Sequence, residues 1–449
     1  MKVAVLKETF PGENRVALVP AHLAPLKKAN LEVIVERGAG LAAGYPDEQY
    51  QQAGATLVAS RADALAQADI VAAVRAFGGN LGIGSAAGGG TTNDALRAGQ
   101  TWIGFCDPLG EPAALQGAAA AGLSVYAMEL IPRTTRAQSM DALSSMAMVA
   151  GYKSVLLGAA QLPKMFPMMM TAAGTVTPAK VFVMGAGVAG LQAIATARRL
   201  GAVVLAYDVR PVAKQEVESL GARFLELPLE TKDAQAAGGY ARAQDEEFLR
   251  RQRQLTMQAL ADQDMVVTTA AVPGRKAPIL ITREMVEVMP PGSVLVDLAA
   301  ERGGNCELTK PGETVVHNGV TIVGPINLPA TIPFHASQLY GKNVTTLLLH
   351  LIKQGFPSVN TSDDVIDATL AVHGGEIRNP MMREKLNLPP LLPKTTPQGS
   401  QDRPIPLAET PAATPPAVPT PASTPAPPAT TAPAETTPPP TNEPPAAGQ

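Results

Sequence analysis

Three glycines and one acidic residue have the types and spacing of a dinucleotide-binding turn. Gly185, Gly187 and Gly190 follow the pattern G-x-G-x-x-G, and Asp208 follows at about the 20-residue distance expected of the acid in this motif. The first glycine permits a tight turn, the second lets the backbone approach a pyrophosphate, and the third lets a helix pack close to a strand. A carboxylate at position 208 accepts hydrogen bonds from ribose hydroxyls and repels a 2′-phosphate. These residues predict an NAD(H) site, although Arg210 is of the type that accommodates a 2′-phosphate.

The residues around this turn are typical of one β–α–β unit. Residues 181–184 form a short apolar run rich in β-branched residues, which favours a buried parallel strand. Residues 191–200 are rich in Ala and Leu and favour a helix whose N-terminus faces the phosphates. Gly201 suits the end of that helix, and residues 203–206 predict the second strand, just before Asp208. This agreement favours a dinucleotide site over the alternative, a glycine-rich turn without a ligand.

A second group of polar residues, Arg133, Arg136, Gln138 and Asp141, is concentrated on a short loop. A long helix is predicted after this loop, to about residue 162, with Ser139 or Asp141 as its cap. The simplest alternative is a solvated loop plus a helix cap. The position of the loop between two α/β halves, where ligand clefts tend to form, favours a functional role.

The remaining chain alternates short apolar runs with helical segments, which predicts an α/β fold with parallel sheets. Helices are predicted at 20–29 and 335–354, and a hairpin at 366–380 around His373. Further strands are predicted at 3–6, 32–36, 70–74, 101–105, 124–127, 265–268, 293–297 and 320–323.

Three segments depart from this alternation. Residues 78–93 are glycine-rich without a clear period and predict a surface loop. The methionines at 168–170 are expected to fill gaps in the core rather than to bind a ligand. From about residue 387 Pro, Thr and Ala dominate, and this composition predicts an extended, disordered tail that serves as a spacer or a partner-docking arm.

A polar stretch at 226–253 follows the predicted nucleotide site. Gly238 and Gly239 at its centre permit motion, and Tyr240 is placed to close over a bound nucleotide as a lid. The alternative is a flexible segment without a role in binding that carries one tyrosine. Residues 269–274 follow the end of a predicted strand, where ligands of parallel sheets are contacted.

The composition restricts the class of protein. A chain of 449 residues that is 46% hydrophobic can form two domains with sizeable cores. A net charge of −3 gives no support for nucleic-acid binding, and two distant cysteines, Cys106 and Cys306, suggest neither a disulfide framework nor a metal site. With no signal peptide and no stretch near the ~20 apolar residues of a membrane span, a soluble cytoplasmic protein is expected.

Several blocks resemble the alanine dehydrogenase and nicotinamide nucleotide transhydrogenase group. One is KETFPGENRVALVP at residues 7–20. The blocks RTTRAQSMD at 133–141, FPMMMTAAG at 166–174 and GGYA at 238–241, with the glycine motif, resemble more specifically the NAD(H)-binding alpha subunits of the proton-translocating (Si-specific/Re-specific) transhydrogenases. The resemblance covers about residues 1–380, and the block RAQSMD is its most specific portion.

This resemblance implies two Rossmann-like domains with parallel sheets separated by a cleft, and a homodimer. The first domain would comprise residues 1–141 and 333–385, the NAD-binding domain residues 142–332, and the disordered tail residues 386–449. Hydride would pass directly from NADH to NADP⁺ on a separate NADP(H)-binding component. A transmembrane component would couple this transfer to proton movement, so that the chain would be cytoplasmic and peripheral to the membrane.

The resemblance also implies the residues of the site, with no metal among its ligands. Arg133, Gln138 and Asp141 would be catalytic. The cofactor-binding set would be Arg133, Gln138, Asp141 and Ser144 at the nicotinamide and its ribose; Gly185, Gly187, Val188, Ala189 and Gly190 at the pyrophosphate; Asp208, Val209 and Arg210 at the adenosine ribose; and Gly239, Tyr240, Gln252 and Ala271 around the rest of the pocket.

The histidines offer a test that is independent of the family. Oxidation of an amine or alcohol releases a proton and needs a general base, usually His, whereas transfer between two nicotinamides moves only a hydride. The cleft motifs contain none of the five histidines, and the resemblance places Asp107 where alanine dehydrogenases have a catalytic histidine. Arg15 and Arg75 nevertheless lie where those dehydrogenases bind a substrate carboxylate. An alanine dehydrogenase-like enzyme therefore remains an alternative, as does a non-catalytic NAD-binding regulator.

Overall fold

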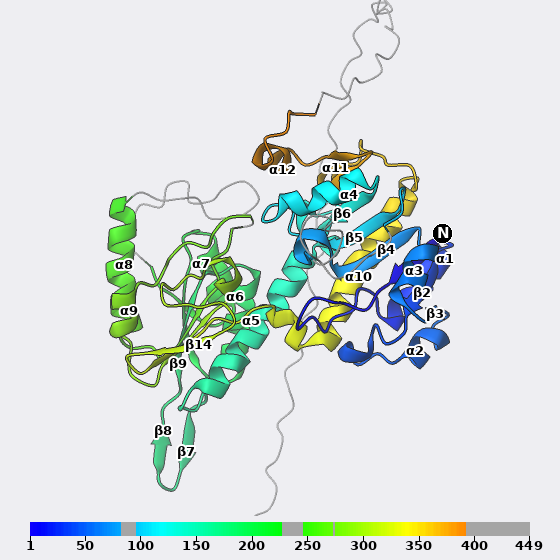
Figure 1. Ribbon diagram of the computed structural model, residues 1–449. Helices are drawn as coiled ribbons and strands as arrows, with labels where there is room; N and C mark the ends of the chain where they lie inside the picture. The colour runs from blue at the N-terminus through cyan, green and yellow to red at the C-terminus, as the bar shows by residue number, and fades with distance from the viewer. Residues whose placement is uncertain (82–95, 227–245, 273, 392–449) are drawn as a thin grey trace, which may run out of the picture. The chain divides into compact units, whose positions relative to one another are not determined.

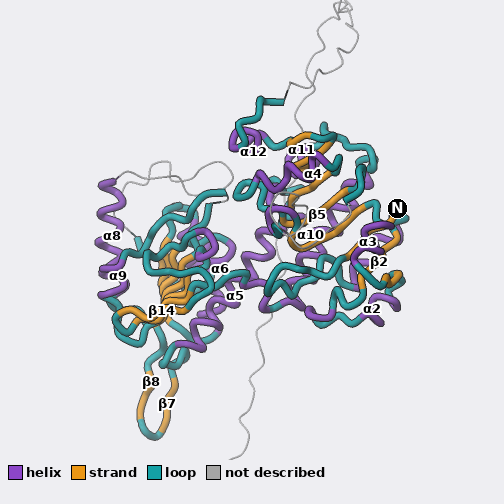
Figure 2. The backbone as a smooth tube through the Cα atoms, in the orientation of Figure 1, coloured by secondary structure: helices purple, strands orange, loops and turns teal. Residues whose placement is uncertain are grey.

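Two large β-sheets and one small hairpin organise the portion of the chain that the computed structural model describes (Figures 1 and 2). The described residues are 1–81, 96–226, 246–272 and 274–391, and side chains are not described at 246–249, 251 and 252. These residues belong to one unit, Met1–Leu392.

The first sheet has eight strands in the order β17-β16-β6-β5-β4-β1-β2-β3. Its first six strands in the sequence pair in parallel, and β16 and β17 extend the sheet by antiparallel pairing next to β6. Alternate residues of one strand enter different cores, Val3 and Val5 on one face and Ala4 on the other, because successive side chains of a strand point to opposite faces. The strands are β1 (Lys2–Val5), β2 (Glu32–Glu36), β3 (Thr56–Val58), β4 (Ile70–Arg75), β5 (Thr101–Phe105), β6 (Ser124–Ala127), β16 (Leu370–His373) and β17 (Glu376–Ile377).

The second sheet has seven strands in the order β11-β10-β9-β12-β13-β15-β14, and only β14 runs antiparallel. Side chains of its strand β9 also pack in two cores, Val181 and Val183 on one face of the sheet and Phe182 and Met184 on the other. Burial on both faces explains why this strand is a continuous apolar run. The strands are β9 (Lys180–Met184), β10 (Val203–Tyr207), β11 (Arg223–Phe224), β12 (Met265–Thr268), β13 (Val294–Asp297), β14 (Thr314–His317) and β15 (Val320–Val323).

Helices cover both faces of each sheet. Residues of α10 pack in a core of the first sheet. Residues of α6, the helix that follows the glycine turn, pack in a core of the second sheet. The helices are α1 (Leu23–Lys28), α2 (Asp47–Gln52), α3 (Arg61–Gln67), α4 (Gln116–Ala120), α5 (Ala142–Gln161), α6 (Val188–Arg199), α7 (Ala213–Ser219), α8 (Glu246–Leu260), α9 (Arg283–Glu287), α10 (Pro333–Lys353), α11 (Asp364–Thr369) and α12 (Pro380–Lys385).

Helix α5 contributes to the cores of both sheets. Met146 and Val149 in its first half pack in a core of the first sheet, whereas Val155 in its second half packs in a core of the second sheet. In length and composition α5 is apolar enough to cross a membrane, contrary to the expectation that no stretch approaches such a span. Burial of its apolar residues in two cores accounts for this composition.

The structure confirms the α/β class with mainly parallel sheets, as well as the predicted unit of strand, glycine turn, helix and strand. Asp141, and not Ser139, caps α5, since its side chain accepts a hydrogen bond from the Ser144 N–H. Five strands begin and end at the predicted residues: β2, β5, β6, β12 and β15.

The predicted hairpin around His373 is confirmed, but it is shorter than 366–380 and comprises β16 and β17, because residues 366–369 finish α11 and Pro380 begins α12. One local prediction is wrong. The methionines at 168–170 do not fill the core, since all three are exposed beside or on the separate hairpin of β7 (Met169–Thr171) and β8 (Gly174–Val176). An exposed apolar hairpin and a core segment have the same composition, which explains this error. The predicted glycine-rich loop beyond residue 81 and the tail beyond residue 391 lie outside the described residues.

Candidate functional site

The glycine turn joins β9 to α6 with very close backbone contacts. Gly185 has φ +100°, a conformation that L side chains rarely adopt, and its N–H donates to the Tyr207 carbonyl at 2.8 Å. A Cβ on Gly190 would lie 1.8 Å from the Gly185 carbonyl oxygen. The Thr269 hydroxyl also donates to that oxygen at 3.0 Å. The turn and the first turn of α6 are therefore locked together, and position 190 has no room for a side chain.

Gly187 differs from its two neighbouring glycines because it faces open space. It precedes α6 with φ −74° and ψ −168°, and no heavy atom of the described chain lies within 4 Å of the place where its Cβ would be. No described side chain caps this helix, and Val188 at its start is exposed. The uncapped N–H groups of the first turn therefore face an accessible surface, as a helix N-terminus that binds a pyrophosphate must. Ala189 is half-buried behind them.

The Asp208 carboxylate follows β10 and accepts hydrogen bonds from two segments of the chain. It accepts from the Ala186 N–H at 2.8 Å, which ties it to the glycine turn. Arg210 supplies its backbone N–H at 2.8 Å and two guanidinium nitrogens at 2.9 Å each. The hydrogen bonds with Asp208 raise the pKa of Arg210 above its usual value. The positive charge of Arg210 is therefore compensated by Asp208, which favours a ribose diol over a 2′-phosphate at this position.

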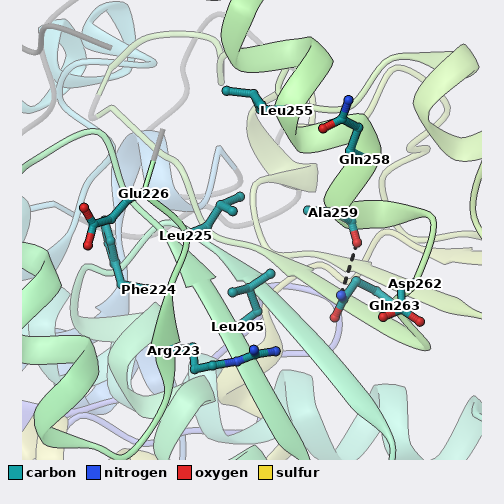
Figure 3. A pocket seen from close by; sticks show the side chains of 10 residues that line it. All are labelled: Leu205, Arg223, Phe224, Leu225, Glu226, Leu255, Gln258, Ala259, Asp262 and Gln263. Atoms are coloured by element: carbon teal, nitrogen blue, oxygen red, sulfur yellow. Dashed lines mark hydrogen bonds between the residues drawn. The ribbon is translucent and has the colours of Figure 1, made fainter. Parts of the chain in front are cut away.

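A hollow of about 160 Å³ adjoins Asp208 and is lined by Tyr207, Val209 and Pro211 and by Phe224 and Leu225 beyond them. Asp208, Lys214 and Glu226 add polar groups to this mainly apolar lining, a combination that suits an adenosine. A larger hollow of about 480 Å³ shares Phe224, Leu225 and Glu226 with it. Figure 3 shows the larger hollow between the edge of the second sheet and α8, where Gln263 donates to the Ala259 carbonyl at 3.1 Å. Its lining includes none of the predicted site residues.

The loop that follows β12, which carries the predicted Ala271, is held by a residue that the sequence analysis did not identify. The Asn305 side chain donates to the Ala270 carbonyl at 2.8 Å and accepts from the Ala270 N–H at 3.0 Å. The buried Asp297 carboxylate in turn accepts from the Asn305 N–H at 2.7 Å. Ala271 itself is exposed. An acid at the carboxyl end of a predicted strand, as Asp297 is, was the available sequence signal for this network.

The polar loop at 133–141 leads directly into α5. The Asp141 carboxylate accepts from the Ser144 N–H at 2.9 Å and from the Ser144 hydroxyl at 2.5 Å, so these two predicted residues lie in contact. Gln138 begins the short 3₁₀ helix η6 (Gln138–Met140), and both Gln138 and Arg133 are exposed. The loop therefore presents the Asp141 carboxylate, the Gln138 amide and the Arg133 guanidinium near the start of α5.

Helix α5 connects this loop to the glycine turn. A Cβ on Gly151 would lie 2.1 Å from the Ala189 carbonyl oxygen, so α5 touches α6 at its first turn. The seven residues from Ser144 to Gly151 correspond to about 10 Å at 1.5 Å per residue. A nucleotide bound with its pyrophosphate at α6 and its nicotinamide near Asp141 would thus lie along α5. Gly239 and Tyr240 lie outside the described residues, as does the side chain of Gln252.

The histidines belong to neither the glycine turn nor the polar loop, although His350 contacts Asp363, which pairs with Arg136 of that loop. Buried His22 accepts from the Val19 N–H at 3.2 Å, and burial together with nearby Lys342 lowers its pKa to about 4. His317 contacts Glu287 at 3.1 Å, His350 contacts Asp363 at 3.0 Å, His373 contacts Ser124 at 2.9 Å, and His335 is exposed beside Phe334. None of these positions suits a base for a substrate at the predicted site.

Asp107, at the position that the resemblance assigns to a catalytic histidine, is engaged in an ion pair. Its carboxylate accepts from the Arg302 guanidinium at 2.6 Å. This hydrogen bond raises the pKa of Arg302 above its usual value. The Asp107 carboxylate is thus occupied by a cation of the chain itself.

Arg15 and Arg75 both contact one buried carboxylate, that of Glu13, at 2.6 and 3.1 Å. Burial alone would raise the pKa of Glu13, but the hydrogen bonds with Arg15 lower it below its usual value. Asn327 completes the cluster, since its side chain donates to Glu13 at 3.0 Å and accepts from Arg15 at 3.1 Å. One of the two positive charges that could bind a substrate carboxylate is therefore already compensated.

Two family models match most of the chain. The model for the alanine dehydrogenase/PNT N-terminal domain matches residues 4–150, and the model for the C-terminal domain of the same family matches residues 154–380.

Individual proteins show the same similarity. An NAD(P) transhydrogenase subunit alpha protein of Rhodospirillum rubrum is 45% identical over 386 residues, which cover 85% of this chain and 99% of that protein. The NAD(P) transhydrogenase subunit alpha of Cereibacter sphaeroides is 44% identical over 85% of this chain and 71% of its own length. An alanine dehydrogenase of Halomonas elongata is 29% identical over 86% of this chain and 97% of that protein.

Two solved structures are also similar. The crystal structure of a transhydrogenase from Sinorhizobium meliloti superimposes with a TM-score of 0.74 at 45% identity, covering 84% of this chain and all of that chain. An L-alanine dehydrogenase structure gives a TM-score of 0.71 at 26% identity, covering 86% of this chain and 99% of that chain.

Proposed function

The chain belongs to the alanine dehydrogenase/PNT family, and from this membership we propose that it is the NAD(H)-binding subunit of a proton-translocating NAD(P) transhydrogenase. Its coenzyme is NAD(H), with NADP(H) on the partner component. The observation that carries the proposal is that Asp107, which stands where alanine dehydrogenases have a catalytic histidine, is an acid paired with Arg302. The similarity of 44–45% to transhydrogenase alpha subunits, against 29% to an alanine dehydrogenase, agrees with it.

The residues present fit a dinucleotide along its whole length. The open position at Gly187 and the uncapped N–H groups of α6 would hold the pyrophosphate, and Asp208 would hold the adenosine ribose. Asp141 and Ser144 at the start of α5, with Arg133 and Gln138 of the loop, would hold the nicotinamide and its ribose. Gly185, Val188, Ala189, Gly190, Val209, Arg210 and Ala271 would complete the pocket among the described residues, with Gly239, Tyr240 and Gln252 as further members.

Bound NADH supplies a hydride without a proton, so the chain's task is to orient and to exclude water rather than to act as a base. The hydrogen bonds of Asp141 with Ser144 fix the carboxylate at the start of α5. Arg133 and Gln138 are exposed, which leaves this end of the site accessible to a second protein. Arg133, Gln138 and Asp141 are therefore the residues that we assign to catalysis of direct transfer to NADP⁺.

Three further features of the proposal come from the family. The acceptor NADP⁺ is carried by a separate component, and a transmembrane component couples hydride transfer to proton translocation in the Si-specific/Re-specific class. The subunit is held at the cytoplasmic side of the membrane by these partners. The domain division follows the same source, with residues 1–141 and 333–385 in one domain and 142–332 in the NAD-binding domain.

A homodimer is supported by the hairpin of β7 and β8. All its strand residues except Val176 are exposed, and Met170 is 80% exposed. In Figure 1 this hairpin extends away from the second sheet at the end of α5. An isolated two-stranded hairpin is only marginally stable in water, and exposed apolar side chains favour an interface, so a second copy of the chain is the proposed occupant.

The test combines the purified chain with the NADP(H)-binding component of a related transhydrogenase. NADPH serves as donor, and the acetylpyridine analogue of NAD⁺, whose reduction has its own absorbance, serves as acceptor. We expect reduction only when both proteins are present. NAD⁺ reduction by alanine without a partner would instead assign the chain to the alanine dehydrogenases, and NADH binding without either activity would assign it to regulators.

A further inference from the structure

The buried carboxylate of Asp363 joins three segments of the chain. Its Oδ1 accepts from the N–H groups of Val365 and Ile366 at 3.0 and 3.1 Å, which caps α11, and contacts His350 Nε2 at 3.0 Å. Its Oδ2 forms an ion pair with Arg136 at 3.2 Å. Arg136 also pairs with the exposed Asp364. Arg136 belongs to the 133–141 loop, so this loop is tied to residues far away in the sequence.

The charge of Asp363 is held in place by its neighbours. Burial alone would raise the pKa of Asp363, but the hydrogen bond with His350 and the Ile366 N–H lower it, as does the charge of Arg136. The side chain of Asp363 is only 5% exposed, whereas that of Arg136 is 51% exposed. A fixed, buried anion therefore contacts a half-exposed cation, and the anion determines where the cation lies.

A second contact ties the same loop to α10. Asn343 donates to the Ser139 carbonyl at 2.9 Å, and its other side-chain atom, Oδ1, is buried without a hydrogen-bond partner among the described residues. An unpaired buried amide oxygen costs about 1–3 kcal/mol. Asn343 is therefore explained by the hydrogen bond that its amide N–H donates, and not by a gain in overall stability. Asn343 and His350 lie seven residues apart, two turns along one face of α10. Helix α10 thus reaches the loop twice, directly through Asn343 and indirectly through His350 and Asp363.

We propose that Asp363 and Asn343 are positioning residues for hydride transfer, which hold the 133–141 loop through Arg136 and through the Ser139 carbonyl. This inference rests on the proposed transhydrogenase function. The two contacts lie on either side of Gln138 and close to Asp141, so the loop between them can present both side chains in one arrangement. Neither Asp363 nor Asn343 contacts a residue that the glycine turn or Asp208 uses to hold the nucleotide. Loss of either contact should therefore disturb transfer and leave nucleotide binding almost unchanged.

The test uses the full chain with Arg136→Gln, Asn343→Asp and the conservative Arg136→Lys. The control is Lys164→Gln, which removes a similar ion pair, that with Asp264 at 2.8 Å, away from the loop. In the chain alone, hydrogen–deuterium exchange is followed at the Ala137 and Met140 amides, which donate to loop carbonyls at 3.0 and 2.8 Å. In the mixture with the NADP(H)-binding component, the NADH dissociation constant and the transfer rate at saturating NADH are measured.

We expect Arg136→Gln and Asn343→Asp to raise loop exchange about tenfold and to slow transfer 10- to 100-fold, since small misplacement of reacting groups costs up to about 100-fold. The NADH dissociation constant should change less than about threefold, Arg136→Lys should recover most of the rate, and the control should match the parent. Unchanged loop exchange, or equal losses of binding and rate, would overturn the inference. Arg136 is half-exposed, so its variants remain informative if Asn343→Asp fails to fold. A parent chain without transfer would overturn the proposed function, whereas the exchange result would still decide whether these residues hold the loop.

Discussion

At the scale of single residues, two glycines of the same turn lack a side chain for different reasons. Gly190 has none because the Gly185 carbonyl oxygen occupies the space, whereas Gly187 faces open space. The first constraint belongs to folding, and the second has no structural cause within the described chain. We therefore attribute the open position at Gly187 to the proposed ligand, the pyrophosphate of the coenzyme.

Gly187→Ala and Gly190→Ala should separate these two roles. We expect Gly187→Ala to change the free energy of unfolding by less than about 0.5 kcal/mol, because its backbone conformation suits alanine. The added methyl group should weaken NADH binding at least about tenfold, since it lies where the pyrophosphate approaches the backbone. Gly190→Ala should lower the free energy of unfolding by about 1–3 kcal/mol or more through overpacking. Denaturant unfolding and NADH fluorescence titration measure both effects, and parental NADH affinity in Gly187→Ala would exclude the proposed pyrophosphate site.

Asp208→Asn should change the choice between the two nicotinamide coenzymes. The substitution removes the charge that compensates Arg210, so this guanidinium becomes available to a 2′-phosphate. Loss of charge-assisted hydrogen bonds worth about 1.5–3 kcal/mol should weaken NADH binding about tenfold or more, while NADPH binding improves. The ratio of the two dissociation constants is the measurement. The double variant Asp208→Asn with Arg210→Gln is the control and should lose the gain in NADPH binding. An unchanged ratio of the NADH and NADPH dissociation constants in Asp208→Asn would contradict the role of the Asp208–Arg210 pair.

At the scale of elements, α5 connects the two ends of the site because it touches α6 at one point and carries Asp141 at its N-terminus. The sequence predicted a long helix capped by Ser139 or Asp141, since capping is a local property, and the cap is Asp141. Its contribution to two cores depends on tertiary packing and could not be predicted from its composition. The contact at Gly151 fixes the distance between the glycine turn and the polar loop.

Gly151→Ala should therefore cost more stability than Gly158→Ala in the same helix. A Cβ at 151 would lie 2.1 Å from the Ala189 carbonyl oxygen, which is backbone and must shift together with α6. A Cβ at 158 would meet Met265 Cε at 2.1 Å, and this end of a flexible side chain can move. We expect a loss of about 1–3 kcal/mol for Gly151→Ala, and less than about 1 kcal/mol for Gly158→Ala, in which the better helix propensity of alanine offsets some of the cost. Equal free energies of unfolding would show that the α5–α6 contact is loosely packed.

Elements whose pattern is local in the sequence were predicted better than features that depend on contacts between distant segments. Buried parallel strands such as β9 and β12 were predicted well, because burial on both faces produces continuous apolar runs. The exposed methionines of the β7–β8 hairpin were misjudged, because their partner is not encoded nearby in the sequence. In the site, the glycine turn and Asp208 were predicted by spacing, whereas Asn305 and Asp363 were missed because their contacts join segments distant in the sequence.

At the scale of the whole molecule, long-range polar contacts connect the segments that carry the two sheets. Glu13 and Arg15 contact Asn327, and Asp107 contacts Arg302. Apart from these contacts, the stability of the chain depends on the charge states of buried groups. His22 is the clearest case, because its Nδ1 accepts the Val19 N–H and cannot do so when protonated.

The contribution of His22 to the stability of the chain should therefore fall as the pH drops from about 6.5 to about 4. In this range the unfolded chain binds a proton at His22 that the folded chain excludes, so the free energy of unfolding decreases with decreasing pH, by on the order of 3 kcal/mol for this group. The variant His22→Asn keeps an acceptor near the Nδ1 position and does not titrate. Burial raises the pKa of Glu8 and Glu129 to about 7, which acts in the opposite direction, so the difference between parent and variant is the relevant quantity. A difference that does not change with pH would exclude the titration of His22.

The central claim is that hydride moves directly between two nicotinamides and that no proton is exchanged with water. The most direct measurement follows deuterium from NADH labelled at C4 on the transferred face, with NADP⁺ on the partner component in ordinary water. We predict that the deuterium appears in NADPH without dilution, and only when both proteins are present. Appearance of the label in water, or in a small acid reduced without the partner, would contradict the account.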